Sequence, residues 1–214
     1  YGRLTRWTDL NGVWAVPGRN YGQEILIIRD AARAPDGSDA SLHAANAHIM
    51  QAGDADNYIY RGLVYLHRGS YAEALDDFKA AHKRNTKRTE PYLGIALAHA
   101  GAGNIKEARR AYEVYLKVAP DDAAALYNYG LTLLAENSPA KAVDPLRDAI
   151  RRAPQNADGY SALAVALIRT KDYTGAWKAL ADGAAIAPTN IDILVNQILL
   201  QACLKDAGDK KKKK

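Results

Sequence analysis

The chain has 214 residues, of which 48% are apolar and 25% are charged, so its composition excludes a fully disordered protein. The net charge is +5, but the last ten residues hold six lysines against two aspartates, so the charge does not indicate a basic face for nucleic acid. One cysteine, Cys203, excludes an internal disulfide and a paired-cysteine metal site. The chain begins at Tyr1 rather than at a methionine, which favours a processed exported or periplasmic protein over a cytoplasmic one.

Residues 1–20 are predicted to form an N-terminal arm that contains a β-hairpin. An Asn-Gly pair at 11–12 separates two short segments in which apolar and polar residues alternate, and this is a strong hairpin signal. The two segments carry Trp7 and Trp14. Because two tryptophans outside any repeat need a surface to lie against, the arm is expected to cover an apolar face.

The rest of the chain repeats with a period of 34 residues. Several registers are in phase: Ala40, Ala74, Ala108, Ala142 and Ala176; Pro120, Pro154 and Pro188; small residues at Gly62, Ala96, Gly130 and Ala164; large residues at Phe78, Tyr112, Leu146 and Leu180. Concurrent registers at one period indicate a repeat protein. The small residues let two antiparallel helices approach closely, the large residues fill the gap beside them, and each proline follows a helix that it cannot continue.

This pattern resembles the tetratricopeptide-repeat (TPR) family, most clearly over 55–88, where Tyr58, Gly62, Ala74 and Phe78 fall at the family's positions. Residues 89–122, 123–156 and 157–190 follow without insertion or deletion. The resemblance implies an all-α fold, a right-handed superhelical TPR solenoid of about four clear repeats. It also implies a non-catalytic protein that holds another protein.

The two ends of the array are less regular. Residues 21–54 are in phase but degenerate, and predict helices near 22–34 and 39–52; an unrelated helical hairpin is the alternative. Residues 191–205 are predicted to form a capping helix, because a terminal repeat would otherwise expose its apolar face. Residues 206–214 are predicted to form a disordered lysine-rich tail, with an anionic surface as its alternative partner.

A concave groove is the binding surface that the resemblance implies, lined by the first helix of each pair. The matching positions here are mostly apolar and predict a groove for an apolar peptide or helix of another protein: Ile59, Leu63, Leu66, His67, Leu93, Leu97, Tyr127, Asn128, Leu131, Leu134, Val165, Ile168 and Arg169. The basic residues with which one TPR subgroup clamps acidic chaperone tails are largely missing. The alternative is that neighbouring repeats share these side chains in their packing.

Acidic residues recur near one rim of this groove, at Asp56, Glu90 and Asp158. They are interpreted either as a solvated edge or as contacts for a basic flank of the ligand. The adjacent pair Asp76-Asp77 is expected to be a solvated face or a helix start, since neighbouring side chains on a helix point about 100° apart and cannot form a two-carboxylate site.

No motif for catalysis, metal or cofactor binding is found, and no specific nucleic-acid binding is expected. The five histidines are scattered, and His99 is expected to be a satisfied core residue. Three functions therefore remain open. The chain is a scaffold for assembly of a larger complex, a structural or self-associating subunit whose groove is filled by residues 1–20, or a binder of anionic surfaces, membranes included, through its tail.

Overall fold

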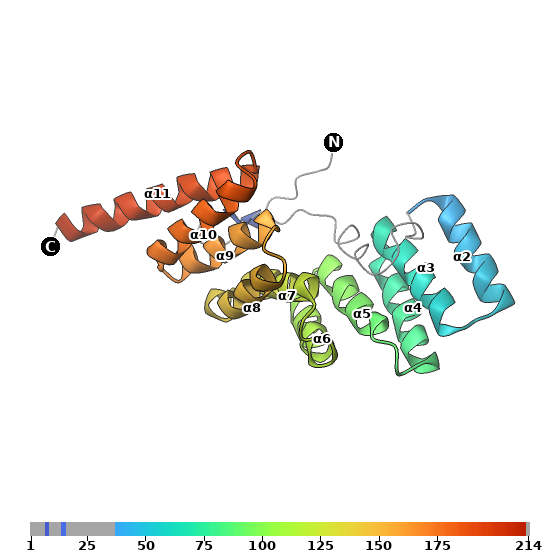
Figure 1. Ribbon diagram of the computed structural model, residues 1–214. Coiled ribbons are helices and arrows are strands. Elements are labelled where there is room, and N and C mark those ends of the chain that lie inside the picture. Colours follow the sequence, from blue (N-terminus) through green and yellow to red (C-terminus); the bar gives the residue numbers. More distant parts are fainter. Residues whose placement is uncertain (1–6, 9–13, 16–36, 213–214) are drawn as a thin grey trace. The chain divides into compact units, whose positions relative to one another are not determined.

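The computed structural model describes residues 7–8, 14–15 and 37–212 (Figure 1). These residues contain ten helices and two strands of two residues each, so the predicted all-α fold is confirmed. The chain divides into two compact units, Arg19–Pro120, called here the first unit, and Tyr1–Gly18 with Asp121–Lys214, called here the second unit.

Two short strands lie where the hairpin is predicted. β1 (Trp7–Thr8) pairs antiparallel with β2 (Trp14–Ala15), with Trp7 opposite Ala15. The Asn-Gly pair and the rest of the arm lie outside the described residues, so the hairpin turn and its role remain predictions.

Five helices form the described part of the first unit, each packed against the next. They are α2 (Asp39–Gln51), α3 (Ala55–Arg68), α4 (Tyr71–Arg84), α5 (Glu90–Gly101) and α6 (Ile105–Val118). Asp54 begins α3 by accepting a hydrogen bond from the Asn57 amide, and Gly69 ends it at φ 74°. α2 lies at the second helix predicted for residues 21–54, whereas the helix predicted near 22–34 falls outside the described residues.

Phe78 shows how the large residues of the repeat pack against the small residues of neighbouring helices. A Cβ atom added to Gly62 on α3 would lie 2.9 Å from the Phe78 ring, and one added to Gly94 on α5 would lie 2.5 Å from it. The ring therefore fills the space that the two glycines leave between neighbouring helices. Gly130 and Leu146 have the same relation in the second unit, with a contact of 2.5 Å.

Asp77 is not solvated, contrary to the expectation for the Asp76-Asp77 pair. Its side chain accepts two hydrogen bonds from Arg61, from Nε and Nη2, each of 2.7 Å, and the residue is 4% exposed. The Arg61 guanidinium also donates to Asn46 on α2 and lies 5.7 Å from the Tyr65 ring centroid. The hydrogen bond to Asp77, opposed by burial, raises the pKa of Arg61. Sequence spacing alone does not show this pair, because the partners belong to different helices.

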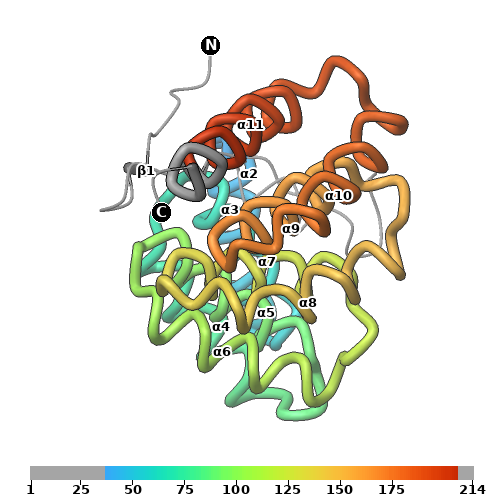
Figure 2. Tube along the Cα trace, turned by 90° about the vertical axis from the view of Figure 1, so that its left-hand side faces the viewer, coloured from blue at the N-terminus to red at the C-terminus, as the bar shows by residue number. Residues whose placement is uncertain are grey.

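The second unit repeats the arrangement with α7 (Ala123–Ala135), α8 (Pro139–Arg152), α9 (Ala157–Arg169), α10 (Tyr173–Ile186) and α11 (Ile191–Lys212). α9 packs against α7, α8, α10 and α11, and α11 also packs against α10 (Figure 2). α7, α9 and α11 thus form one layer, and α8 and α10 form the other. Asn137 makes the turn after α7 at φ 59°, a conformation in which asparagine commonly replaces glycine.

One local expectation is corrected. α11 continues to Lys212, so residues 206–212 are helical rather than disordered. Lysine is a good helix former and is favoured by the dipole near a helix C-terminus, which explains the extension. None of the described helices is long and apolar enough to span a bilayer.

Polar contacts join residues about one repeat apart in each unit. In the first unit Arg84 Nε donates to the Gly53 carbonyl oxygen at 2.6 Å. In the second unit Arg152 Nε donates to the Asp121 carboxylate at 3.0 Å. Each arginine lies at the end of the second helix of a hairpin and donates to the loop just before the first helix of the same hairpin, so it holds the two helices together.

His99 on α5 is half-buried, but it is not satisfied as expected, because its Nδ1 has no hydrogen-bond partner within the described part of the chain. Burial lowers the pKa of His99 below its ordinary value of 6.5, Lys79 lowers it further, and Glu107 opposes the shift. The folded state thus favours the neutral imidazole.

We expect the free energy of unfolding to fall as the pH drops below 6.5, the ordinary His99 value, toward the lower folded pKa. Above 6.5 the contribution of the neutral imidazole is fully present. A His99→Leu variant lacks this titration, so its stability should decline less than that of the parent between neutral and mildly acidic pH. Urea unfolding followed by circular dichroism measures the difference. Parallel pH profiles for the two proteins would contradict this assignment.

Candidate functional site

Most of the predicted groove residues are buried. In the first unit Ile59, Leu66, Leu93 and Leu97 belong to the core, and Leu63 and His67 are half-buried. Leu97 is 2% exposed. These side chains are covered because neighbouring helices share them in packing, the alternative that the sequence leaves open. The apolar surface available to a ligand is accordingly smaller than the row of residues suggests.

The same holds for the second unit, with two exceptions. Tyr127, Asn128, Leu134, Val165 and Ile168 are buried, whereas Leu131 and Arg169 are half-buried. Residues that lie buried among helices can still form the floor of a surface depression. Three of these buried residues, Tyr127, Leu134 and Val165, line such a depression together with the half-buried Leu131.

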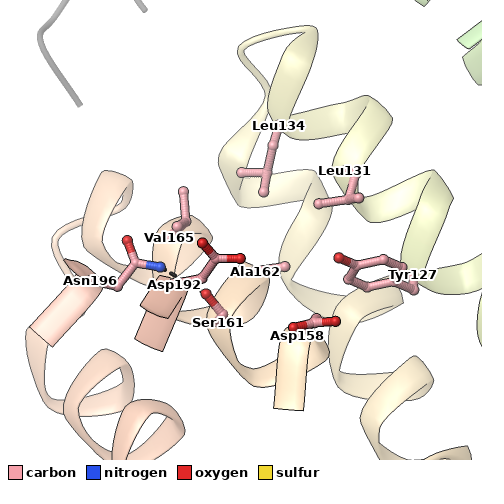
Figure 3. A pocket seen from close by; sticks show the side chains of 9 residues that line it. All are labelled: Tyr127, Leu131, Leu134, Asp158, Ser161, Ala162, Val165, Asp192 and Asn196. Atoms are coloured by element: carbon pink, nitrogen blue, oxygen red, sulfur yellow. Dashed lines mark hydrogen bonds between the residues drawn. The ribbon is translucent and has the colours of Figure 1, made fainter. Parts of the chain in front are cut away.

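A pocket opens between the first helices of the second unit (Figure 3). Its lining comes from α7, α9 and α11: Tyr127, Leu131, Leu134, Asp158, Ser161, Ala162, Val165, Asp192 and Asn196. We call it the α7–α9–α11 pocket. Its volume is about 40 Å³, room for a few water molecules, whereas small-molecule sites enclose roughly 300 Å³ or more. The pocket therefore suits part of a side chain on a larger ligand.

Polar and apolar residues are segregated along the helices of the pocket. Asp158 and Asp192 lie in the first turns of α9 and α11. Leu131 and Leu134 on α7, and Val165 on α9, lie further along their helices. The pocket thus offers carboxylate acceptors at one end and aliphatic contacts at the other.

Asn196 on α11 is the most buried polar residue of the lining. It is 2% exposed, and its Nδ2 donates to Ser161 Oγ at 2.8 Å (Figure 3). Its Oδ1 has no hydrogen-bond partner among the residues that the structure describes. A buried acceptor without a donor is costly, so this oxygen provides a place for a donor from a ligand.

Arg169 is engaged within the protein. Its Nη1 donates to the Leu134 carbonyl oxygen at 3.1 Å, and its Nη2 donates to Asn137 Oδ1 at 2.7 Å. The side chain thus holds the turn that follows α7. Asn128, the one candidate for a carboxylate clamp, is buried, and its backbone carbonyl accepts a hydrogen bond from the Thr132 hydroxyl.

The sequence pattern does not predict Asp192 and Asn196 as site residues, because it indicates only a capping role for residues 191–205. The 34-residue register contains a usable signal, since Asp192 follows Asp158 by one period. Within the described residues no group of three or more histidine, cysteine, aspartate or glutamate side chains could hold a metal ion.

Comparisons with known proteins agree with this architecture. The family model for the tetratricopeptide repeat matches residues 93–157 and 146–191. Serine/threonine-protein phosphatase 5 of Mus musculus is 31% identical over 100 residues, which cover 47% of this chain. The chain spans only 20% of the length of that phosphatase, so the match concerns a part of it.

Solved TPR structures extend the likeness over most of the chain. YrrB, described as a TPR protein with an unusual peptide-binding site, is 18% identical, covers 73% of this chain and 81% of its own, and gives a TM-score of 0.64. MamA from Desulfovibrio magneticus RS-1 is 20% identical, covers 75% of this chain and 96% of its own, and gives a TM-score of 0.62. At these identities the structures show the fold. The family match over residues 93–191 shows that this chain contains tetratricopeptide repeats, and the structures show that it has the TPR fold.

Proposed function

We propose that this protein is a non-catalytic scaffold that binds an apolar peptide or helix of another protein and thereby helps to assemble a larger complex. TPR proteins in general are scaffolds for protein–protein interaction. The α7–α9–α11 pocket supports the proposal as the place of binding, since it combines a half-buried Leu131 with the aliphatic floor of Leu134 and Val165.

The size and composition of the pocket favour a peptide over a metabolite. Its small volume accommodates the end of one anchoring side chain, while the layer of α7, α9 and α11 supplies the surface on either side. An amphipathic helix or an extended segment inserts anchors of this kind at regular spacing. Full burial of a leucine-sized side chain contributes about 1.5–3 kcal/mol, and a pocket that takes only part of one contributes a fraction of that.

The experiment compares two variants that each add one negative charge to the second unit. Leu131→Glu places a carboxylate in the pocket, and Trp177→Glu replaces a side chain on α10 that is 56% exposed and does not line it. Each protein is used for affinity capture from cells that express the natural protein, with mass spectrometry as the readout. A partner lost with Leu131→Glu but retained with Trp177→Glu is expected. Circular dichroism checks that both variants remain helical.

The proposal fails if both variants capture the same partners as the parent. In that case the pocket does not contribute to binding, and the interaction surface lies elsewhere on the chain.

A further inference from the structure

The last helix, α11, carries apolar residues on two opposite sides. Ile193, Asn196 and Leu200 are buried and lie on the side that packs against α9 and α10. At 100° per residue, a second row of aliphatic residues lies on the side facing away. We call this row the outer stripe: Ile191, Leu194, Val195, Ile198 and Ala202. All five are exposed, by as much as 73% at Ile191 and 68% at Ile198. Such a helix has the composition of one that is covered on every side.

Exposed apolar side chains are concentrated on this helix. Of the nine large apolar residues that are exposed within the described part of the chain, five belong to α11. The terminal element of a repeat array ordinarily presents a polar outer face, which keeps the array soluble. α11 covers the core formed by α9 and α10, but it replaces one apolar surface with another. The outer stripe therefore has the character of an interaction surface rather than of a cap.

The size of Ile198 makes a further TPR repeat a poor cover for the outer stripe. Residue 198 is the register equivalent of Gly62 and Gly130. At these glycines the second helix of the same repeat approaches so closely that an added Cβ atom would lie 2.9 Å and 2.5 Å from its side chains. Isoleucine keeps a covering helix further away. Spacings of three and four residues along the stripe instead fit a helix packed side by side, at about 8–10 Å between the axes.

The outer stripe is complementary to a second copy of itself in antiparallel orientation. When Val195 of one copy lies opposite Ile198 of the other, Ile191 lies opposite Ala202 at both ends of the seam. A large residue then packs against a small one at each end, and two β-branched residues meet on either side of the centre. The same segment of α11 thus supplies both halves of the seam, as the two-fold symmetry of a dimer requires.

The charges of α11 favour the same orientation. Lysines occur at 205 and 210–214, at the end of the helix and beyond it. Two parallel copies would place these lysines side by side, where like charges repel, whereas antiparallel copies keep them apart. Each set of lysines then points toward the start of the other α11. That start lies beside the exposed Asp182 of α10, since Gly183 packs against Ile193. The two ends of the seam therefore carry opposite formal charge.

We propose that the protein forms a symmetric dimer by antiparallel pairing of the outer stripes of two α11 helices. The stripe presents an apolar patch of the order of 500 Å², as large as the largest patches of ordinary monomers. Two copies together bury about 1,000 Å², the lower bound for a specific interface. No residue of the outer stripe lines the α7–α9–α11 pocket. The dimer therefore presents two such pockets, one on each copy.

The oligomeric state of the full chain tests this proposal. Sedimentation velocity over a range of concentrations should show a dimer of the parent that dissociates on dilution. Ile198→Glu places a charge near the centre of the seam and should raise the dimer dissociation constant at least roughly tenfold. Ile198→Ala, the small residue that the register has at 96 and 164, should weaken the dimer as well. Met50→Glu, at a position on α2 that is 88% exposed, is the matched control and should leave the dimer unchanged. Circular dichroism checks that each variant remains helical.

Disulfide cross-linking tests the orientation of the two helices. Ile191→Cys and Ala202→Cys are made separately in a Cys203→Ser background, mixed and oxidised. The two positions are 11 residues apart, which corresponds to about 16 Å along a helix. Antiparallel pairing should therefore give the mixed disulfide between the two variants. Parallel pairing would link each variant to itself. Intact mass spectrometry distinguishes the products.

Three results would overturn the inference. A monomer at every concentration would exclude the dimer, and a dimer that Ile198→Glu leaves unchanged would place the interface elsewhere. Monomers that bind vesicles of anionic phospholipid, and lose this binding with Ile198→Glu, would assign the outer stripe to a membrane surface. These measurements do not involve the capture of partners through Leu131, so failure of the dimer leaves the proposed scaffold function to be decided by its own experiment.

Discussion

Replacing Asp77 with alanine is expected to lower the free energy of unfolding by about 3 kcal/mol, because the change leaves a partly buried arginine without its carboxylate. Arg61 would lose both short hydrogen bonds to Asp77 and keep the one to Asn46. Asp77 joins α4 to α3, so these two helices lose a direct connection, while the contact from Arg61 to α2 remains. Urea unfolding followed by circular dichroism measures the effect.

Asp76 provides a matched control for this experiment. It is the neighbouring aspartate on the same helix, and it is exposed. Asp76→Ala should change the free energy of unfolding by no more than about 0.5 kcal/mol. If the two alanine variants were equally stable, the ion pair between Arg61 and Asp77 would have no net stabilising role.

A second large effect is expected at Phe78, which is 1% exposed and packs between α3 and α5. Phe78→Ala should cost about 3–5 kcal/mol, since Gly62 and Gly94 carry no side chains that could fill the space left by the ring. Phe78→Leu should cost less than about 1.5 kcal/mol, because leucine occupies the same register at 146 and 180. Thermal and urea unfolding give both values.

The close approach of Gly94 makes a sharper test of the same packing. In the parent, Gly94→Ala brings a methyl group within 2.5 Å of the Phe78 ring and should destabilise the protein by about 1–3 kcal/mol. In the Phe78→Ala background the same methyl group enters the vacated space, so its cost should largely disappear. Additive effects of the two substitutions would show that the ring is not held between the helices in this way.

The fold was predictable from the sequence because its packing follows the repeat. Gly62 with Phe78, and Gly130 with Leu146, pair small and large registers that are visible without coordinates. The pair of Arg61 and Asp77 was not predictable, since the two residues are separated by 16 positions that follow no repeat register. The charge of Asp77 predicts exposure to solvent, whereas its burial depends on Arg61 of the neighbouring helix α3.

The candidate site was predictable only in part. First-helix positions follow from the register, so Tyr127, Leu131, Leu134 and Val165 could be assigned to one face. The burial of Leu97 could not be read from the register, because it depends on how closely the neighbouring hairpin packs. Asp192 and Asn196 could not be predicted, because the register indicates that the last helix covers the core and does not show that it also lines a pocket.

The polar contacts that span one repeat also affect how each unit comes apart. Arg84 with Gly53, and Arg152 with Asp121, close hairpins, while Arg169 fastens the turn of the preceding hairpin around Asn137. When one hairpin opens, the neighbouring hairpin therefore loses hydrogen bonds, and its apolar side chains become exposed to solvent. Nearest-neighbour coupling of this kind makes repeats exchange their amide protons as blocks rather than helix by helix. Fraying that begins at one helix of a unit should accordingly advance in steps of a whole repeat.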